Sequence, residues 1–142
     1  MCLADRCLKR LVSELAKPGL SDSARMQGTW VMLSGATSGT PVPVEFVREM
    51  RRVAKGREVR VSWEKELYFW ATVTLNPAAN PKEVDYLLLD GPNAGEIQRG
   101  IYSISGDTLR FCFSRPGAAR ATDFTTVADD GRTFSIWVPL KH

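Results

Sequence analysis

Gln27-Gly28-Thr29-Trp30 is the stretch that decides the fold. From here almost to the end of the chain, apolar and polar residues alternate with a period of two, and short turns interrupt the alternation at regular intervals. Such a train of short strands is typical of an antiparallel sheet that closes on itself. The pattern therefore predicts an all-β barrel opened by a Gly-x-Trp strand, and it says little about activity.

The turns indicate how many strands the barrel contains. Lys55-Gly56 and Ser105-Gly106-Asp107 predict tight hairpins, and short connections make neighbouring strands antiparallel. We expect an eight-stranded up-and-down barrel, or nine strands if the weaker segment 122–127 also pairs. The eight strands are expected at roughly 27–34, 48–54, 57–63, 66–75, 83–90, 96–104, 107–114 and 132–140. Apolar residues at helical spacing between Pro41 and Glu49 favour one turn of helix before the second strand.

Residues 1–25 differ from the barrel in pattern. Apolar residues follow one helical stripe over 3–17, and Lys17-Pro18-Gly19 ends it. The domain boundaries that follow are an amphipathic helix with its connector over 1–25 and a barrel over 26–142. The apolar stripe needs a cover, on the barrel itself or on a second subunit. Because no unbroken apolar stretch opens the chain, we expect no secretory signal, no membrane span and a cytoplasmic protein.

Composition excludes several classes of function. The 142 residues carry a net charge of +3, and 44% of them are hydrophobic, which is the balance of one soluble domain with no nucleic-acid partner. The one histidine is His142, and the three cysteines have neither disulfide nor zinc spacing. Cys112 is expected to pack as a small apolar residue. No Gly-rich phosphate loop or acidic cluster is present, so we expect no cofactor and no metal.

Several motifs occur in order between residues 26 and 140. They are Gly28-x-Trp30, Leu75-Asn76-Pro77, Asp90-Gly91-Pro92, Thr122-Asp123-Phe124 and, most specific, Gly106-Asp107-Thr108-Leu109-Arg110-Phe111-Cys112-Phe113-Ser114-Arg115-Pro116-Gly117. With these motifs the chain resembles a lipocalin-like domain family of uncharacterised bacterial proteins. The resemblance implies a lipocalin-type barrel in which Gly28 and Trp30 form the structural base, and it implies no particular reaction.

An inward Trp30 assigns the interior faces of the other strands, because side chains alternate across a strand. The expected interior then comprises Leu67, Phe69, Ala71, Val73, Leu75, Val84, Tyr86, Leu88, Gly100, Tyr102, Ile104, Leu109, Phe111, Phe113, Phe134, Ile136, Val138 and Leu140. Outside the barrel, Tyr68, Trp70, Leu87 and Leu89 form an apolar patch. The N-terminal helix or a second copy of the chain would cover this patch, so a homodimer through either element is one expectation.

The alternation also turns Arg52 inward, together with Met50 and Ala54. A buried guanidinium needs either an internal ion pair or a ligand carboxylate or phosphate, and the sequence leaves both open. The candidate ligand-binding residues are Arg52, Phe69, Tyr86, Gln98, Tyr102 and Phe111.

Two classes of function fit this interior, and a third fits the surface. The first is binding of a small, mainly apolar molecule, with or without an anionic group, in the barrel cavity. The alternative is a cofactor-independent cyclase or isomerase in which Tyr86, Tyr102 or Arg52 donates to developing negative charge. The third is a packed-barrel scaffold or oligomerisation module that holds no ligand, which the many bulky interior residues would allow.

Overall fold

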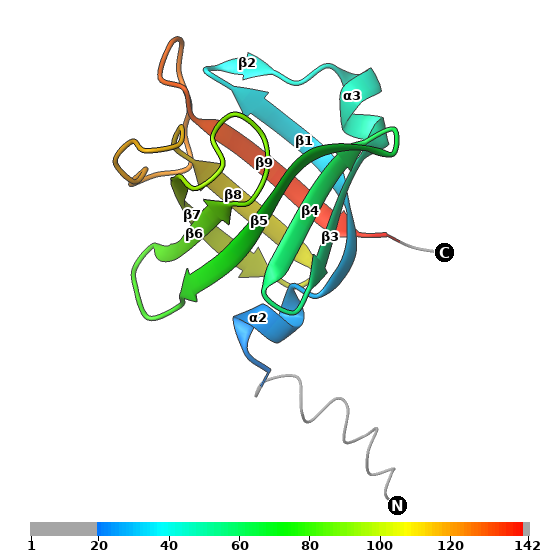
Figure 1. Ribbon diagram of the computed structural model, residues 1–142, viewed down its shortest axis with the longest axis vertical. Helices are drawn as coiled ribbons and strands as arrows, with labels where there is room; N and C mark the ends of the chain where they lie inside the picture. The colour runs from blue at the N-terminus through cyan, green and yellow to red at the C-terminus, as the bar shows by residue number, and fades with distance from the viewer. Residues whose placement is uncertain (1–19, 141–142) are drawn as a thin grey trace, which may run out of the picture.

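The computed structural model of the protein describes residues 20–140, and its main element is a closed antiparallel barrel (Figure 1). The eight barrel strands confirm the predicted count and the up-and-down order, since each strand pairs with its neighbours in sequence and the last returns to the first. They are β1 (Gly28–Thr37), β3 (Met50–Lys55), β4 (Glu58–Trp63), β5 (Glu66–Asn76), β6 (Lys82–Leu88), β7 (Ile97–Ser105), β8 (Thr108–Phe113) and β9 (Thr133–Pro139).

Closure of the barrel depends on β1, which is long enough to pair with two neighbouring strands. Its first half pairs with β3, and most of its length pairs with β9, with a bulge between Met32 and Ser34. Beyond the bulge, β1 also pairs with the short strand β2 (Thr40–Pro41). This short strand is the extra one, whereas the segment 122–127, expected as a ninth strand, forms a bend followed by irregular backbone. Paired edges leave the barrel no open side.

Two short helices flank the barrel at opposite ends. Helix α2 (Asp22–Arg25) lies at the end that we call the base, where the Ser21 hydroxyl accepts a hydrogen bond from the amide of Ala24 (Figure 1). Helix α3 (Val44–Glu49) is the helical turn expected between Pro41 and Glu49, and it leads directly into β3. Neither helix of residues 20–140 is long and apolar enough to cross a membrane. The helix predicted over 3–17 lies outside the described residues.

Trp30 lies inside the base of the barrel, as the alternation predicted, and only 5% of its surface is exposed. Its indole Nε1 donates to the carbonyl oxygen of Met26 over 2.9 Å, and Met26 is itself buried. Gly28 opens the strand at a φ of +104°, a conformation that side chains disfavour. Helix α2 and the first strand are therefore tied together under the core.

The predicted interior face of β9 is wrong. Opposite β8, Trp137 pairs with Leu109 and Ser135 with Phe111, so Ser135 and Trp137 face inward. Phe134 instead packs outside the barrel on a second cluster that contains Ile101, Cys112, Ala121 and Phe124. Ile136, Val138 and Leu140 are half-buried and belong to neither buried cluster. The alternation failed here because the more apolar face of β9, with Phe134, Ile136 and Val138, lies outside the barrel, while the inward face carries Ser135 beside Trp137, and only the pairing with β8 shows this.

A second correction concerns β5. The pairing with β4 shifts after Val61, so that Val61 lies opposite Phe69 while Ser62 lies opposite Leu67, and Tyr68 is the extra residue. This bulge turns Leu67 outward, where 46% of its surface is exposed, although it was expected inside. Tyr68 lies at the rim of a cavity and is not part of a continuous outer patch.

The rest of the predicted outer patch is partly covered by charged side chains. The guanidinium of Arg60 lies 4.6 Å from the centre of the Trp70 ring, and the Trp70 indole donates to Glu58 over 2.9 Å. Leu87 remains exposed and Leu89 is half-buried. Cys112 is buried in the second cluster, where it packs as a small apolar residue as expected. Burial raises the pKa of its thiol.

Candidate ligand-binding cavity

A cavity of about 360 Å³ lies within the barrel at the end opposite α2, and we call it the mouth cavity. The loops β6–β7 and β8–β9 border its opening, and both loops lie at the end of the barrel away from α2 (Figure 1). Its volume is at the small end of the range for pockets that bind small molecules. The lining includes Met32, Met50, Arg52, Val61, Tyr68, Phe69, Tyr86, Leu88, Asp90, Gln98, Phe111, Phe113, Ser135 and Trp137.

Arg52 is the most unusual residue of this lining, because only 1% of its surface is exposed. Its Nη2 donates to the Tyr86 hydroxyl over 3.2 Å, and the guanidinium carbon lies 4.8 Å from the centre of the Phe111 ring. The Nε and Nη1 atoms are buried without a hydrogen-bond partner. Within residues 20–140 no carboxylate forms an ion pair with Arg52. The internal ion pair considered from the sequence is therefore not found in the described part of the chain.

The sheet register explains why this guanidinium is inside. Arg52 lies directly opposite Trp30 on one side and Val61 on the other, and both of these residues are buried in the core. Directly opposed residues share a face of the sheet, so Arg52 cannot reach solvent without a shift of register.

Aromatic rings form one wall of the mouth cavity. Tyr86 lies at the centre of this wall, with its ring 4.3 Å from Phe113 and 5.4 Å from Phe69 between centroids. Phe111 and Phe113 stack at 5.5 Å. These rings come from β5, β6 and β8, and their tilted and stacked geometries are favourable for aromatic pairs. The wall is already packed without any other group, so the cavity is preformed.

The polar groups of the cavity are few and mostly bonded to one another. The side-chain amide of Gln98 donates to the carbonyl oxygen of Ser114 over 3.0 Å, which fixes it against the end of β8. The Trp137 indole donates to the Ser135 hydroxyl over 2.9 Å. Asp90 lies at the exposed opening. Among the described residues, Arg52, Tyr86 and Ser135 are therefore the buried polar groups of this lining that retain free hydrogen-bonding capacity, and of these only Arg52 is charged.

Five of the six candidate residues named from the sequence line the mouth cavity: Arg52, Phe69, Tyr86, Gln98 and Phe111. Sequence reasoning did not select Phe113, Ser135, Trp137 or Tyr68 as ligand contacts, although they share the lining. Phe113 carried a usable signal, since it alternates with Phe111 on the inward face. Tyr68 carried none, because the bulge that turns it toward the opening leaves no mark in the alternation.

Tyr102, the sixth candidate, lies at the base. Its hydroxyl donates to Asp22 Oδ2 over 2.6 Å, and Lys82 Nζ lies 2.9 Å from the same oxygen. Burial alone would raise the pKa of the Asp22 carboxyl, but the hydrogen bonds from Tyr102 and Lys82 outweigh it and hold that pKa below its ordinary value. Burial and the neighbouring Asp22 carboxylate raise the pKa of the Tyr102 phenol. These groups fasten α2 to β6 and β7.

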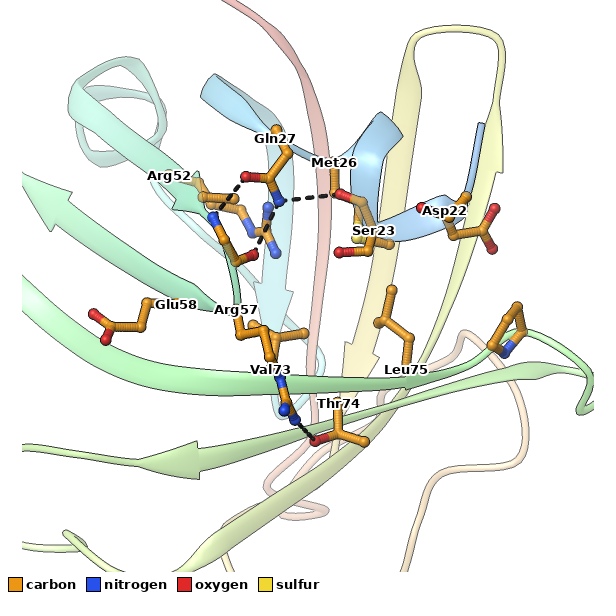
Figure 2. A pocket seen from close by; sticks show the side chains of 14 residues that line it. Asp22, Ser23, Met26, Gln27, Arg52, Arg57, Glu58, Val73, Thr74 and Leu75 are labelled. Atoms are coloured by element: carbon orange, nitrogen blue, oxygen red, sulfur yellow. Dashed lines mark hydrogen bonds between the residues drawn. The ribbon is translucent and has the colours of Figure 1, made fainter. Parts of the chain in front are cut away.

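A second cavity, of about 370 Å³, opens beside α2, and we call it the base cavity (Figure 2). Its polar groups are largely occupied. Gln27 forms hydrogen bonds with both the amide and the carbonyl of Gly56, and Arg57 donates to Thr74 (Figure 2). Arg52 is the one described residue that lines both cavities. Within residues 20–140, the base cavity therefore offers no other side chain with free donors that is as deeply buried as Arg52.

Among residues 20–140, no group of histidine, cysteine, aspartate or glutamate side chains could hold a metal ion. No protein-family model, curated protein or solved structure matches the chain. The fold and the site define its class only as a closed antiparallel β-barrel with a preformed internal cavity. Its function is therefore inferred from the geometry of that cavity.

Proposed function

We propose that this protein is a lipocalin-like binding protein that holds a small, mainly apolar molecule in the mouth cavity. The observation that supports this proposal best is a buried guanidinium with free N–H groups in the wall of a mainly apolar cavity. Burying such a charge without a partner is costly, and an unpaired charge that lines a cavity is a candidate for a functional site. A solidly packed scaffold would need neither the cavity nor the charge.

Adjacent leucines on β6 provide a test. Leu88 lines the cavity, whereas Leu87 is exposed on the outside of the same strand. We expect Leu88→Trp to fill the cavity and to abolish uptake of an apolar fluorescent probe such as 1-aminoanthracene, while Leu87→Trp leaves uptake unchanged. Native mass spectrometry of the purified protein would detect a copurified ligand. Equal uptake by both variants, or none by the unmodified protein, would contradict the proposal.

A cofactor-independent isomerase or cyclase is the second candidate, and one contact favours it. The Tyr86 hydroxyl accepts a hydrogen bond from Arg52 inside the cavity, so the phenol is polarised toward a bound molecule. If the protein is such an enzyme, a bound compound should convert to an isomer of equal mass. Tyr86→Phe should then abolish conversion while binding persists. Recovery of the bound compound unchanged after long incubation would exclude this activity for that compound.

A further inference from the structure

We propose that the ligand of the mouth cavity is a compact monocarboxylate whose carboxylate binds to Arg52 and Tyr86. This inference rests on the proposed binding function and specifies its chemical class. The deep end of the cavity presents hydrogen-bond donors for which the described residues provide no acceptor.

Arg52 provides the first of these donors. A guanidinium carries five N–H groups in one plane, and one of them is used in the bond from Nη2 to Tyr86. Nε and Nη1 have no partner. The two contacts of the guanidinium, with Tyr86 and Phe111, are both to residues that line the mouth cavity and not the base cavity. These two contacts hold the guanidinium in the wall of the mouth cavity, although Arg52 also lines the base cavity, so we assign its free donors to the mouth cavity.

Tyr86 adds another donor at the same place. Its hydroxyl oxygen accepts from Arg52, and among the hydrogen bonds of residues 20–140 its own proton is given to no acceptor. A hydroxyl that already accepts can still donate, so one oxygen atom placed beside Arg52 can bind to both residues. Two parallel N–H groups facing two coplanar oxygen atoms is the arrangement that guanidinium and carboxylate form most readily.

Charge distinguishes a carboxylate from a phosphate monoester. Among residues 20–140, Arg52 and Asp90 are the only charged side chains that line the mouth cavity, and Asp90 is exposed at the opening. One buried positive charge compensates one negative charge. A phosphate monoester carries nearly two at neutral pH, so its second charge would be buried without a partner. The site therefore favours a single negative charge.

The residues of the cavity wall indicate the chemistry of the rest of the ligand. Beyond Arg52, the cavity is bounded by the rings of Phe69, Phe111 and Phe113 and by aliphatic side chains. A flat apolar body can stack against these rings. Because the volume is only about 360 Å³, the body should be compact, as a bicyclic ring is, and not a long acyl chain.

Three naphthalene compounds of similar shape test the inference by calorimetry at neutral pH. They are naphthalene-2-carboxylate, its neutral amide, and 2-naphthyl phosphate. We expect the carboxylate to bind about 10- to 100-fold more tightly than the amide, which is the ratio expected for charged hydrogen bonds. We expect the phosphate to bind more weakly than the carboxylate. Equal affinity for carboxylate and amide would overturn the inference and leave apolar binding intact, whereas no binding of any of the three would contradict both.

Variants at Arg52 test whether this residue causes the preference for the carboxylate over the amide. Arg52→Met should remove the preference for the carboxylate over the amide and retain binding of the amide. Arg52→Lys keeps the charge without the planar pair of donors and should retain only part of the preference. Arg60 is an exposed arginine on the adjacent strand β4. Arg60→Met is therefore the matched control and should retain the full preference for the carboxylate. A preference that survives Arg52→Met would overturn the inference.

Discussion

The Nη2 atom of Arg52 donates to the Tyr86 hydroxyl across 3.2 Å, and both side chains are almost entirely buried. This bond and the contact with the Phe111 ring are what the described residues offer to a fully desolvated positive charge. A cation over an aromatic ring gains about 2 kcal/mol at a desolvated site, which is less than the cost of burying the charge. The pair therefore costs the folded protein stability, as the proposed binding function would require.

The first prediction is that apolar replacement of this pair stabilises the protein in the absence of ligand. Arg52→Met alone leaves the Tyr86 hydroxyl buried without its donor, which costs about 1–3 kcal/mol. The double variant Arg52→Met/Tyr86→Phe removes both groups and should raise the free energy of unfolding by about 1–4 kcal/mol. Urea denaturation measures both effects. A double variant less stable than the original protein would mean that the pair is a structural element.

The second prediction concerns the base of the barrel. Trp30→Ala should lower the free energy of unfolding by about 3–5 kcal/mol, because a large buried side chain is lost. Trp30→Phe keeps most of the volume and deletes the bond to Met26, so its cost should be smaller, about 1–2 kcal/mol. Trp70, which lies half-exposed on the outer face, is the matched control. If Trp70→Ala costs as much as Trp30→Ala, the inward orientation of Trp30 is wrong.

Alternation along the strands predicted which face a side chain occupies, and it succeeded where one face is clearly apolar. Arg52 illustrates this, because Met50 and Ala54 on the same face identify it as inward. The method failed on β9, where Phe134 and Trp137 compete for the interior and the register with β8 decides. It also failed at the bulge beside Tyr68, since a bulge depends on pairing and not on composition.

Alternation also does not show how far along the barrel an inward-facing residue lies. Tyr86 and Tyr102 share the inward face of adjacent strands, but Tyr86 lines the mouth cavity and Tyr102 meets Asp22 at the base. The register places Tyr86 opposite Gln98 and Tyr102 opposite Lys82, which are far apart along the strands. The candidate site was thus predictable as a set of inward residues, and its division between two ends was not.

The third prediction uses Gly100, where β7 lies close to the aromatic wall. A Cβ atom at this position would lie 2.9 Å from the carbonyl oxygen of Cys112 and closer still to the Phe113 ring. Gly100→Ala should therefore displace Phe113, lower the free energy of unfolding by about 1–3 kcal/mol and weaken probe binding in the mouth cavity. Gly35→Ala is the milder comparison for stability, because its nearest contacts begin at 3.2 Å, and it should lower the free energy of unfolding less. An equal loss of stability in the two variants would contradict this account.

The final prediction is that Asp22 makes stability depend on pH. Its pKa in the folded protein lies below the ordinary 3.8, so the stabilisation is complete above that value and is lost as the pH falls through 3.8 toward the folded pKa. Asp22→Asn should lower the free energy of unfolding at neutral pH, and the difference from the original protein should shrink below about pH 4. Tyr102→Phe should reduce the same dependence, because the Tyr102 hydroxyl bond is one of the contacts that lower the pKa. Glu66→Gln, at an exposed position, is the control and should leave the pH profile unchanged. Thermal unfolding between pH 2.5 and pH 7 (the range that spans 3.8) measures the profiles, and an Asp22→Asn curve parallel to that of the original protein throughout would show that the carboxylate does not hold α2 at the base.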